Sequence, residues 1–189
     1  MSAIIDTIEY EDGVVAEISH DEFCESPIKH DDAVEIVVLS RRYSDPAEGR
    51  LGSTGSEVEQ WRKDNAADWF TINLWAYDHS GVVYRASDDN PFTVDRDWDT
   101  AQAGIVALKR SEFGKGDLSD AEMAEHASRI ADEYSDWAAG NCYAFVLKDA
   151  DGSEVAEGNG LIGREALEAA AADAARQHLS TRDVRATTP

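Results

Sequence analysis

Aspartates are crowded into the segment 87–100, where their spacing suggests cation binding. Five of them lie there: Asp88, Asp89, Asp95, Asp97 and Asp99. Many calcium loops begin with alternating acidic residues, because carboxylate oxygens are the ligands that Ca²⁺ prefers. An EF-hand loop that begins at Asp95 would need glycine at position 100 and glutamate at position 106, where the chain has Thr100 and Val106. An EF-hand is therefore excluded. A looser Ca²⁺ or Mg²⁺ site stays open beside the simpler interpretation, a solvated acidic loop with no metal, anchored by Phe92 and Trp98.

A second possible site is the turn after the apolar run 69–76, where Asp78 precedes His79. A histidine beside a carboxylate can act as a general base. Together with Asp95, Asp97 and Asp99, this pair could form a metal-dependent hydrolase. Aspartate beside a histidine is also ordinary turn chemistry. Because no serine or cysteine lies in a nucleophile motif such as G-x-S-x-G, we assign no catalytic residue and no cofactor.

Two further patterns fall short of a site. His20, Cys24 and His30 are close in sequence but lack the paired spacing of a zinc site. The glycines of the segment 158–163 are not followed by the Lys-Ser/Thr pair of a phosphate-binding loop. We interpret that segment as a flexible turn between a strand and a helix.

The segment 119–140 predicts a helix with one acidic face. Ser119 and Glu122 have the spacing of a capping box, and Gly140 is expected to end the helix. An apolar stripe recurs at steps of three and four residues: Met123, Ala127, Ile130, Tyr134 and Trp137. Five carboxylates lie off this stripe: Glu122, Glu125, Asp132, Glu133 and Asp136. Side chains three or four residues apart on a helix are neighbours, so this face could imitate a row of phosphates or could be an ordinary solvated face.

The charge of the whole chain is strongly negative. Its 189 residues include 39 Asp and Glu against 17 Lys and Arg, which gives a net charge of -22. Such a chain repels nucleic acid and anionic membranes and is attracted to basic protein surfaces. We therefore expect a basic partner surface, with no direct contact to nucleic acid or membrane. Adaptation to a saline host, or a GC-rich genome, would produce a similar composition.

The remaining composition favours a cytoplasmic, reducing compartment. The first residues are acidic and lack the apolar core of a signal peptide. No apolar run approaches the roughly 20 residues that a membrane helix needs. The two cysteines set no disulfide framework. The oligomeric state stays open.

The order of elements predicts an α+β fold, an antiparallel or mixed β-sheet covered by two to three helices. We expect strands at 14–18, 33–39, 69–76, 82–85, 104–108, 142–147 and 154–156, of which 69–76 and 82–85 form a hairpin. Helices are expected from a capping box at Ser56–Glu59 to about Asn65, over 119–140, and over 163–179. We expect a single acidic domain over 1–180 and a polar C-terminal tail over 181–189.

Three segments carry a resemblance to a known family. They are Tyr77-Asp78-His79-Ser80-Gly81, Asn90-Pro91-Phe92-Thr93 and Trp98-Asp99-Thr100-Ala101-Gln102-Ala103-Gly104. The chain resembles a family of small acidic proteins encoded by phages, plasmids and integrated elements, over about residues 24–175. The resemblance implies an origin in a mobile element and no particular reaction.

Together these observations predict a binding protein more than an enzyme. We expect an inhibitor of a host nucleic-acid-binding defence system that acts by imitating DNA phosphates. The aspartates of 87–100 and the carboxylates of the helix 119–140 are the predicted contact residues. The alternatives are the metal-dependent hydrolase described above and an accessory protein whose acidity is a halophilic adaptation.

Overall fold

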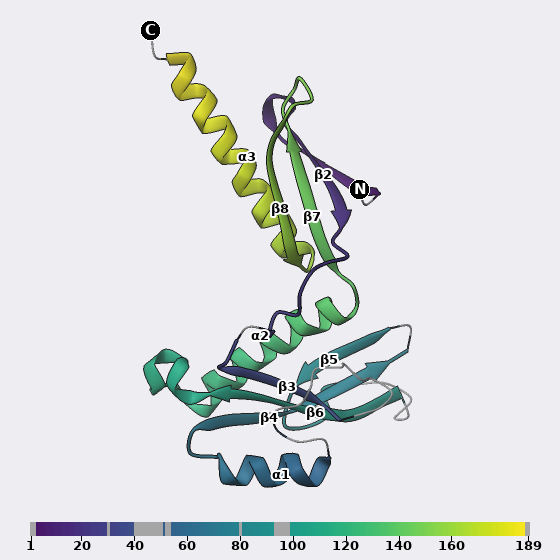
Figure 1. Ribbon diagram of the computed structural model, residues 1–189, viewed down its shortest axis with the longest axis vertical. Coiled ribbons are helices and arrows are strands. Elements are labelled where there is room, and N and C mark those ends of the chain that lie inside the picture. The colour runs from purple at the N-terminus through teal and green to yellow at the C-terminus, as the bar shows by residue number, and fades with distance from the viewer. Residues whose placement is uncertain are drawn as a thin grey trace. The chain divides into compact units, whose positions relative to one another are not determined.

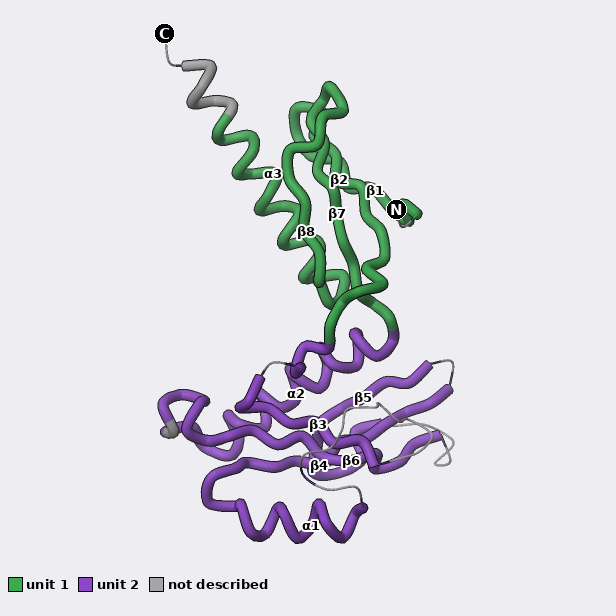
Figure 2. The backbone as a smooth tube through the Cα atoms, viewed as in Figure 1, with its two compact units in different colours: residues 1–25, 140–189 green, residues 26–139 purple. Residues whose placement is uncertain are grey.

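The computed structural model describes residues 3–29, 31–39, 51, 54–79, 81–92 and 99–187. In these residues the chain forms two four-stranded antiparallel sheets and three α-helices. The predicted α+β class is confirmed. Contacts within the chain group into two compact units, residues 1–25 with 140–189 and residues 26–139 (Figure 2). Unit 2 is thus an insertion between two strands of unit 1. The single domain expected over 1–180 stays a prediction.

Unit 1 is a sheet with one long helix on one face (Figure 1). Its sheet has the order β1-β2-β7-β8. The elements are β1 (Ile4–Glu9), β2 (Val15–His20), β7 (Cys142–Lys148), β8 (Glu154–Ile162) and α3 (Arg164–Thr187), with a short 3-10 turn, η1 (Glu11–Gly13). Helix α3 includes residues 181–187, most of the segment expected to be a tail.

The core of unit 1 is built on β2, along which buried and half-buried residues alternate. Ala16 and Ile18 point to the same face as their neighbours Leu147 and Phe145 on β7, because directly paired residues of antiparallel strands share a face. The apolar residues of α3 repeat at helical spacing and pack onto these four side chains, with Leu167 fully buried. Burial of apolar surface between α3 and the sheet therefore holds this unit together.

Unit 2 is a sheet covered on both faces. Its sheet has the order β3-β6-β4-β5. The elements are β3 (Val34–Val38), α1 (Gly55–Asp64), β4 (Trp69–Asp78), β5 (Val82–Ala86), β6 (Thr100–Lys109) and α2 (Asp120–Ala138), with two short 3-10 turns, η4 (Arg110–Glu112) and η5 (Gly114–Gly116). In Figure 1, α1 and α2 lie on opposite faces of this sheet.

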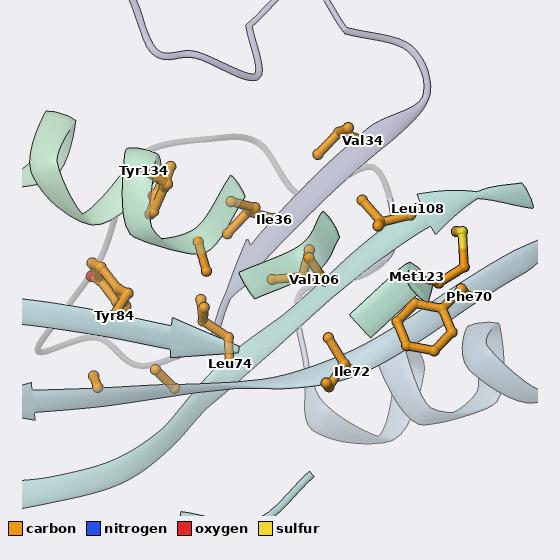
Figure 3. Close-up of a cluster of buried hydrophobic side chains, with 14 residues drawn as sticks. Val34, Ile36, Phe70, Ile72, Leu74, Tyr84, Val106, Leu108, Met123 and Tyr134 are labelled. Carbon is orange, nitrogen blue, oxygen red and sulfur yellow. The ribbon is translucent and has the colours of Figure 1, made fainter. Parts of the chain in front are cut away.

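Two hydrophobic clusters fill unit 2, one on each face of the sheet. Met123 and Tyr134 of α2 pack against Ile72, Leu74 and their neighbours on the central strands (Figure 3). The second cluster, on the side of α1, contains Val37, Leu51, Val58, Ile105 and Ala107. Residues 105–108 of β6 are all buried, because this central strand contributes side chains to both clusters.

Several predicted elements are confirmed and others differ. The hairpin β4–β5 and helix α2 form where expected, with Gly140 directly after the α2 C-cap at a φ of 77°. Helix α1 is capped by Thr54 instead of Ser56, because Glu57 is the acidic residue that reaches back to the cap. Strand β1 was not predicted. Residues 158–162 belong to β8 and not to a turn, because they pair with β7.

Candidate functional site

Helix α2 positions the acidic face that the sequence predicts. Its N-terminus is fixed by a capping box, in which the Glu122 N–H donates to the Ser119 hydroxyl and the Ser119 N–H donates to the Glu122 carboxylate. On the opposite side Met123, Ala127 and Tyr134 are buried in the core. The rotation of the helix is therefore set by its apolar stripe, and the carboxylates are turned away from the sheet.

The predicted α2 carboxylates all lie on this outer side. Glu122, Glu125, Asp132 and Glu133 are exposed, and Asp136 is half-buried. From residue 122 to residue 136 the helix rises about 21 Å at about 1.5 Å per residue. Along one strand of DNA the same length spans about six phosphates, at about 3.4 Å each. Five carboxylates over that length approach the charge density of a single nucleic-acid strand.

Basic side chains interrupt this acidic face in two places. Arg85 of β5 donates to Asp132, with 2.7 Å between Nη1 and Oδ1. Arg129 belongs to the same helical face, and its Nη2 lies 2.8 Å from Nδ1 of His126. The ion pair is about half exposed on both sides, so it is weak and screened by salt. Glu125 and Glu133 are exposed carboxylates of this face and take part in neither of these two interactions.

The carboxylate of Glu122 takes part in the N-terminal cap of α2. The Ser119 hydroxyl donates a hydrogen bond to its Oε2 at 2.6 Å. This bond, together with the Ser119 N–H, lowers the pKa of the Glu122 carboxyl from its ordinary value. Glu122 therefore stays charged to lower pH, and its carboxylate is already engaged within the helix cap.

The five predicted aspartates of the segment 87–100 have different surroundings. Asp88 and Asp89 are exposed after the end of β5. Asp95 and Asp97 lie outside the described residues. Asp99 directly precedes β6 and is only 5% exposed. Asp99, which the sequence analysis placed with the binding residues, is thus buried in the structure, and its role in binding stays a prediction.

Asp99 instead belongs to a small cluster at the tip of the β4–β5 hairpin. Its Oδ2 lies 3.7 Å from Nδ1 of His79, whose side chain is 61% exposed. This is an ion-pair distance and too long for a hydrogen bond. The His79 ring stacks on Tyr77 with 6.1 Å between the ring centroids, and Tyr77 also contacts Phe92 at 5.6 Å.

Hydrogen bonds connect the same cluster to the chain that follows β5. The Asn90 side-chain amide donates to the Thr100 hydroxyl at 3.1 Å, and the Phe92 N–H donates to the Asn90 side chain at 3.0 Å. Residues from all three of the segments that carry the family resemblance thus meet at one end of unit 2. Asn90 and Thr100 were not predicted as site residues, and their only signal was their place in those segments.

The remaining sequence-based candidates are not brought together. Of the possible zinc ligands, His20 is the last residue of β2, Cys24 lies in the segment after it, and His30 lies outside the described residues. Among the residues that the structure describes, no three His, Cys, Asp or Glu side chains are grouped so that they could hold a metal ion. Within the same residues, no helix has the length and apolar character needed to cross a membrane.

No protein-family profile, curated protein or solved structure matches the chain.

Proposed function

We propose that this protein is an acidic binding protein whose α2 face occupies a basic groove made for nucleic acid. The observation that supports the proposal is the placement of Glu122, Glu125, Asp132, Glu133 and Asp136 on one side of one rigid helix. A helix whose opposite side is packed into a core already has an ordered backbone, so that only the side chains of its charged face lose freedom on binding.

The net charge of -22 strengthens this proposal at long range. A strongly charged protein accelerates its own encounter with a surface of opposite sign, and the effect decreases steeply with ionic strength. The natural targets are proteins that hold DNA or RNA through Lys and Arg, because their grooves are built for a row of negative charges. Because the chain resembles mobile-element proteins, we expect its targets to be restriction, CRISPR or related defence complexes of a host cell. The chain would act as an inhibitor of such a complex.

A displacement experiment tests the proposal. Purified restriction and CRISPR complexes would be bound to fluorescent DNA, and the full chain would be titrated in at 50 mM and 300 mM NaCl. We expect the chain to displace DNA from at least one complex at low salt and far less at high salt. If it displaces DNA from none of them, or if displacement is insensitive to salt, phosphate imitation is the wrong mechanism.

Matched variants test whether the α2 face is responsible. Glu125→Gln with Glu133→Gln removes two exposed charges from this face, and Glu154→Gln with Glu157→Gln removes two exposed charges from β8. An exposed ion pair is worth about 0.2–1 kcal/mol. The α2 variant should therefore weaken displacement about two- to thirtyfold, whereas the β8 variant should weaken it much less. Equal losses would mean that only total charge matters.

The pairing of His79 with Asp99 supports a second candidate, a hydrolase that uses His79 as a general base. In catalytic pairs a buried carboxylate accepts a hydrogen bond from one ring nitrogen of a histidine, so that the other nitrogen can accept a proton. Asp99 would have to move from 3.7 Å to hydrogen-bond distance of His79 to do the same. The test is hydrolysis of nitrophenyl esters and phosphates, with and without Mg²⁺, by the full chain and by His79→Gln. Turnover that the His79→Gln variant loses would support this candidate, and turnover that it keeps would exclude His79 as the base.

A further inference from the structure

Unit 1 contains a pocket that the acidic face of α2 does not explain. It has a volume of about 510 Å³, within the range of about 300–1,000 Å³ typical of small-ligand sites. Its walls are the segment 19–25 at the end of β2, Ala144 of β7, and Asn159 and Gly160 of β8. The strands β2, β7 and β8 are neighbours in this sheet (Figure 1), so the pocket lies wholly within one compact unit.

The charge of the pocket is negative. Asp21, Glu22 and Glu25 line it, and among the described residues that line it none is a lysine or an arginine. The Asp21 carboxylate is held in place from two sides: the Phe23 N–H donates to Oδ1 at 2.9 Å, and the Gly160 N–H donates to Oδ2 at 2.8 Å. Each carboxylate oxygen can accept a second hydrogen bond. Asp21 is thus a fixed anion that can still bind a donor.

The rim of the pocket carries an aromatic ring that contributes little to folding. Phe23 is 90% exposed, whereas the large apolar side chains of the unit 1 core are buried. Another residue that lines the pocket, His20, stacks on Tyr143 with 5.4 Å between ring centroids. An exposed ring next to carboxylates is suited to a flat cation, which it can contact through its face.

We propose that this pocket binds a guanidinium group, carried either by an arginine of a peptide or by a free small molecule. Guanidinium is planar, presents several N–H donors in a fork that matches a carboxylate, and stacks on aromatic rings. The carboxylates disfavour phosphates and other anions, and an ammonium ion lacks the flat shape. The pocket belongs to unit 1 and depends on no residue of α2, so it is independent of the function proposed above.

A titration of the ¹⁵N-labelled full chain tests this inference. The probes are N-acetyl-arginine amide for a peptide arginine, agmatine for a free guanidinium compound, and N-acetyl-citrulline amide as the uncharged control of nearly the same shape. We expect the arginine probe, agmatine or both to shift the amide signals of Phe23 and Gly160, and citrulline to leave them in place. Agmatine also carries an ammonium group, so tighter binding of the arginine probe, despite its lower charge, would identify a peptide arginine as the source of the guanidinium group.

Variants locate the binding energy within the pocket. Asp21→Asn should weaken binding about 10- to 150-fold, because a hydrogen bond to a charged group is worth about 1.5–3 kcal/mol. Phe23→Ala should weaken it about two- to fivefold, because an exposed cation–π contact is worth about 0.5–1 kcal/mol. Phe23 is so exposed that its removal should leave the fold intact, which keeps the test valid even if Asp21→Asn unfolds unit 1.

Two charge-matched variants separate a site from general attraction. Glu22→Gln removes one carboxylate of the pocket, and Asp151→Asn removes an exposed one from the turn between β7 and β8, outside the pocket lining. Of these two variants, we expect Glu22→Gln to weaken binding of the cationic probes and Asp151→Asn to leave it unchanged. The inference is wrong if citrulline binds as well as arginine, if neither cationic probe shifts Phe23 or Gly160, or if Asp151→Asn weakens binding as much as Glu22→Gln. The α2 variant Glu125→Gln with Glu133→Gln should bind the probes normally, so a failure of the α2 proposal leaves this one intact.

Discussion

Ser135 is a polar residue on the buried side of α2. It is 6% exposed, and its hydroxyl accepts a hydrogen bond from the Tyr84 N–H of β5 at 2.9 Å. Replacing it with alanine takes this acceptor away from a buried backbone donor, and such a loss costs about 1–3 kcal/mol. We therefore expect Ser135→Ala to lower the free energy of unfolding by that amount, measured by urea denaturation.

The control for Ser135 lies on the same helix. Ser128 is half-buried, and alanine is a better helix former than serine, so Ser128→Ala should leave stability within about 0.5 kcal/mol of the parent chain. Similar losses in both variants would show that the bond to Tyr84 does not stabilise the packing of α2 against β5.

At the scale of single residues, the sequence could place a side chain in a local turn but could not identify its neighbours from distant parts of the chain. Asp78 and His79 were correctly placed at a hairpin because a turn is specified by a few adjacent residues. The approach of Asp99 to His79 joins positions 20 apart in the chain, and it depends on the pairing of β4 with β6. Nothing in the local spacing of aspartates could show that Asp99 is buried while Asp88 is exposed.

At the scale of elements, the close pairing of β6 with β3 depends on a glycine, Gly104 of β6. A Cβ atom at Gly104 would lie 1.7 Å from the carbonyl oxygen of Val37 on β3, so only glycine allows the two strands this close an approach. We expect Gly104→Ala to cost about 3 kcal/mol or more. Gly81→Ala is the control, since its Cβ would have no atom within 4 Å. Equal stability of the two variants in urea would mean that β3 is not held in this register.

The start of α2 gives a prediction that depends on pH. Ser119→Ala removes the cap and should cost about 1 kcal/mol at pH 7, whereas Ser119→Thr keeps the hydroxyl and should cost less. The pKa of Glu122 is lowered in the folded state, chiefly by the hydrogen bond from Ser119. A lowered pKa stabilises the fold above the unfolded value and loses this effect as the pH falls through the folded value.

Ser119→Ala removes the main cause of that lowered pKa. The difference in stability between the parent chain and Ser119→Ala should therefore shrink as the pH falls below the ordinary value of 4.5 for this carboxyl. Denaturation with urea at a series of pH values from 7 to 3 measures it. If the difference in stability between the two proteins stays constant over this range, the Ser119 hydroxyl does not donate a hydrogen bond to the Glu122 carboxylate in solution.

Elements with strong local signals were predictable, and those defined by pairing were not. Helix α2 has a capping box, an apolar stripe and a terminal glycine, three signals that agree. Strand β1 is mostly exposed and has a partner on one side only, so its sequence carries no burial pattern. The glycines of β8 suggested a turn, but Gly158 pairs with Phe145, whose ring would collide with a Cβ at that position. The reason for that glycine lies on another strand.

At the scale of the whole molecule, the chain leaves unit 1 after Glu25 and returns to it at Gly140. The amino-acid composition does not change at either of these two points in the chain. The sequence analysis therefore had no signal for a division into two units. Each unit has its own sheet and its own buried clusters. The acidic helix α2 belongs to unit 2 and the proposed guanidinium pocket to unit 1, so the two proposed binding sites have separate structural supports.

Separate cores predict separate unfolding, and the chain contains a natural reporter for it. All five tryptophans lie within residues 26–139, so tryptophan fluorescence follows unit 2 alone, whereas circular dichroism also follows α3 of unit 1. Leu147 is fully buried in unit 1, and Leu147→Ala should cost about 2–5 kcal/mol there. We expect this variant to shift an early part of the circular dichroism transition in urea and to leave the fluorescence transition unchanged.

The reciprocal variant completes this test. Leu74 is fully buried in unit 2, and Leu74→Ala should shift the fluorescence transition while α3 keeps its own. If Leu147→Ala moves the fluorescence transition as far as the circular dichroism transition, the two units unfold as one cooperative body. In that case each of the two substitutions would lower one free energy of unfolding that belongs to the whole chain. A two-state molecule has a single unfolding equilibrium, to which every buried residue contributes.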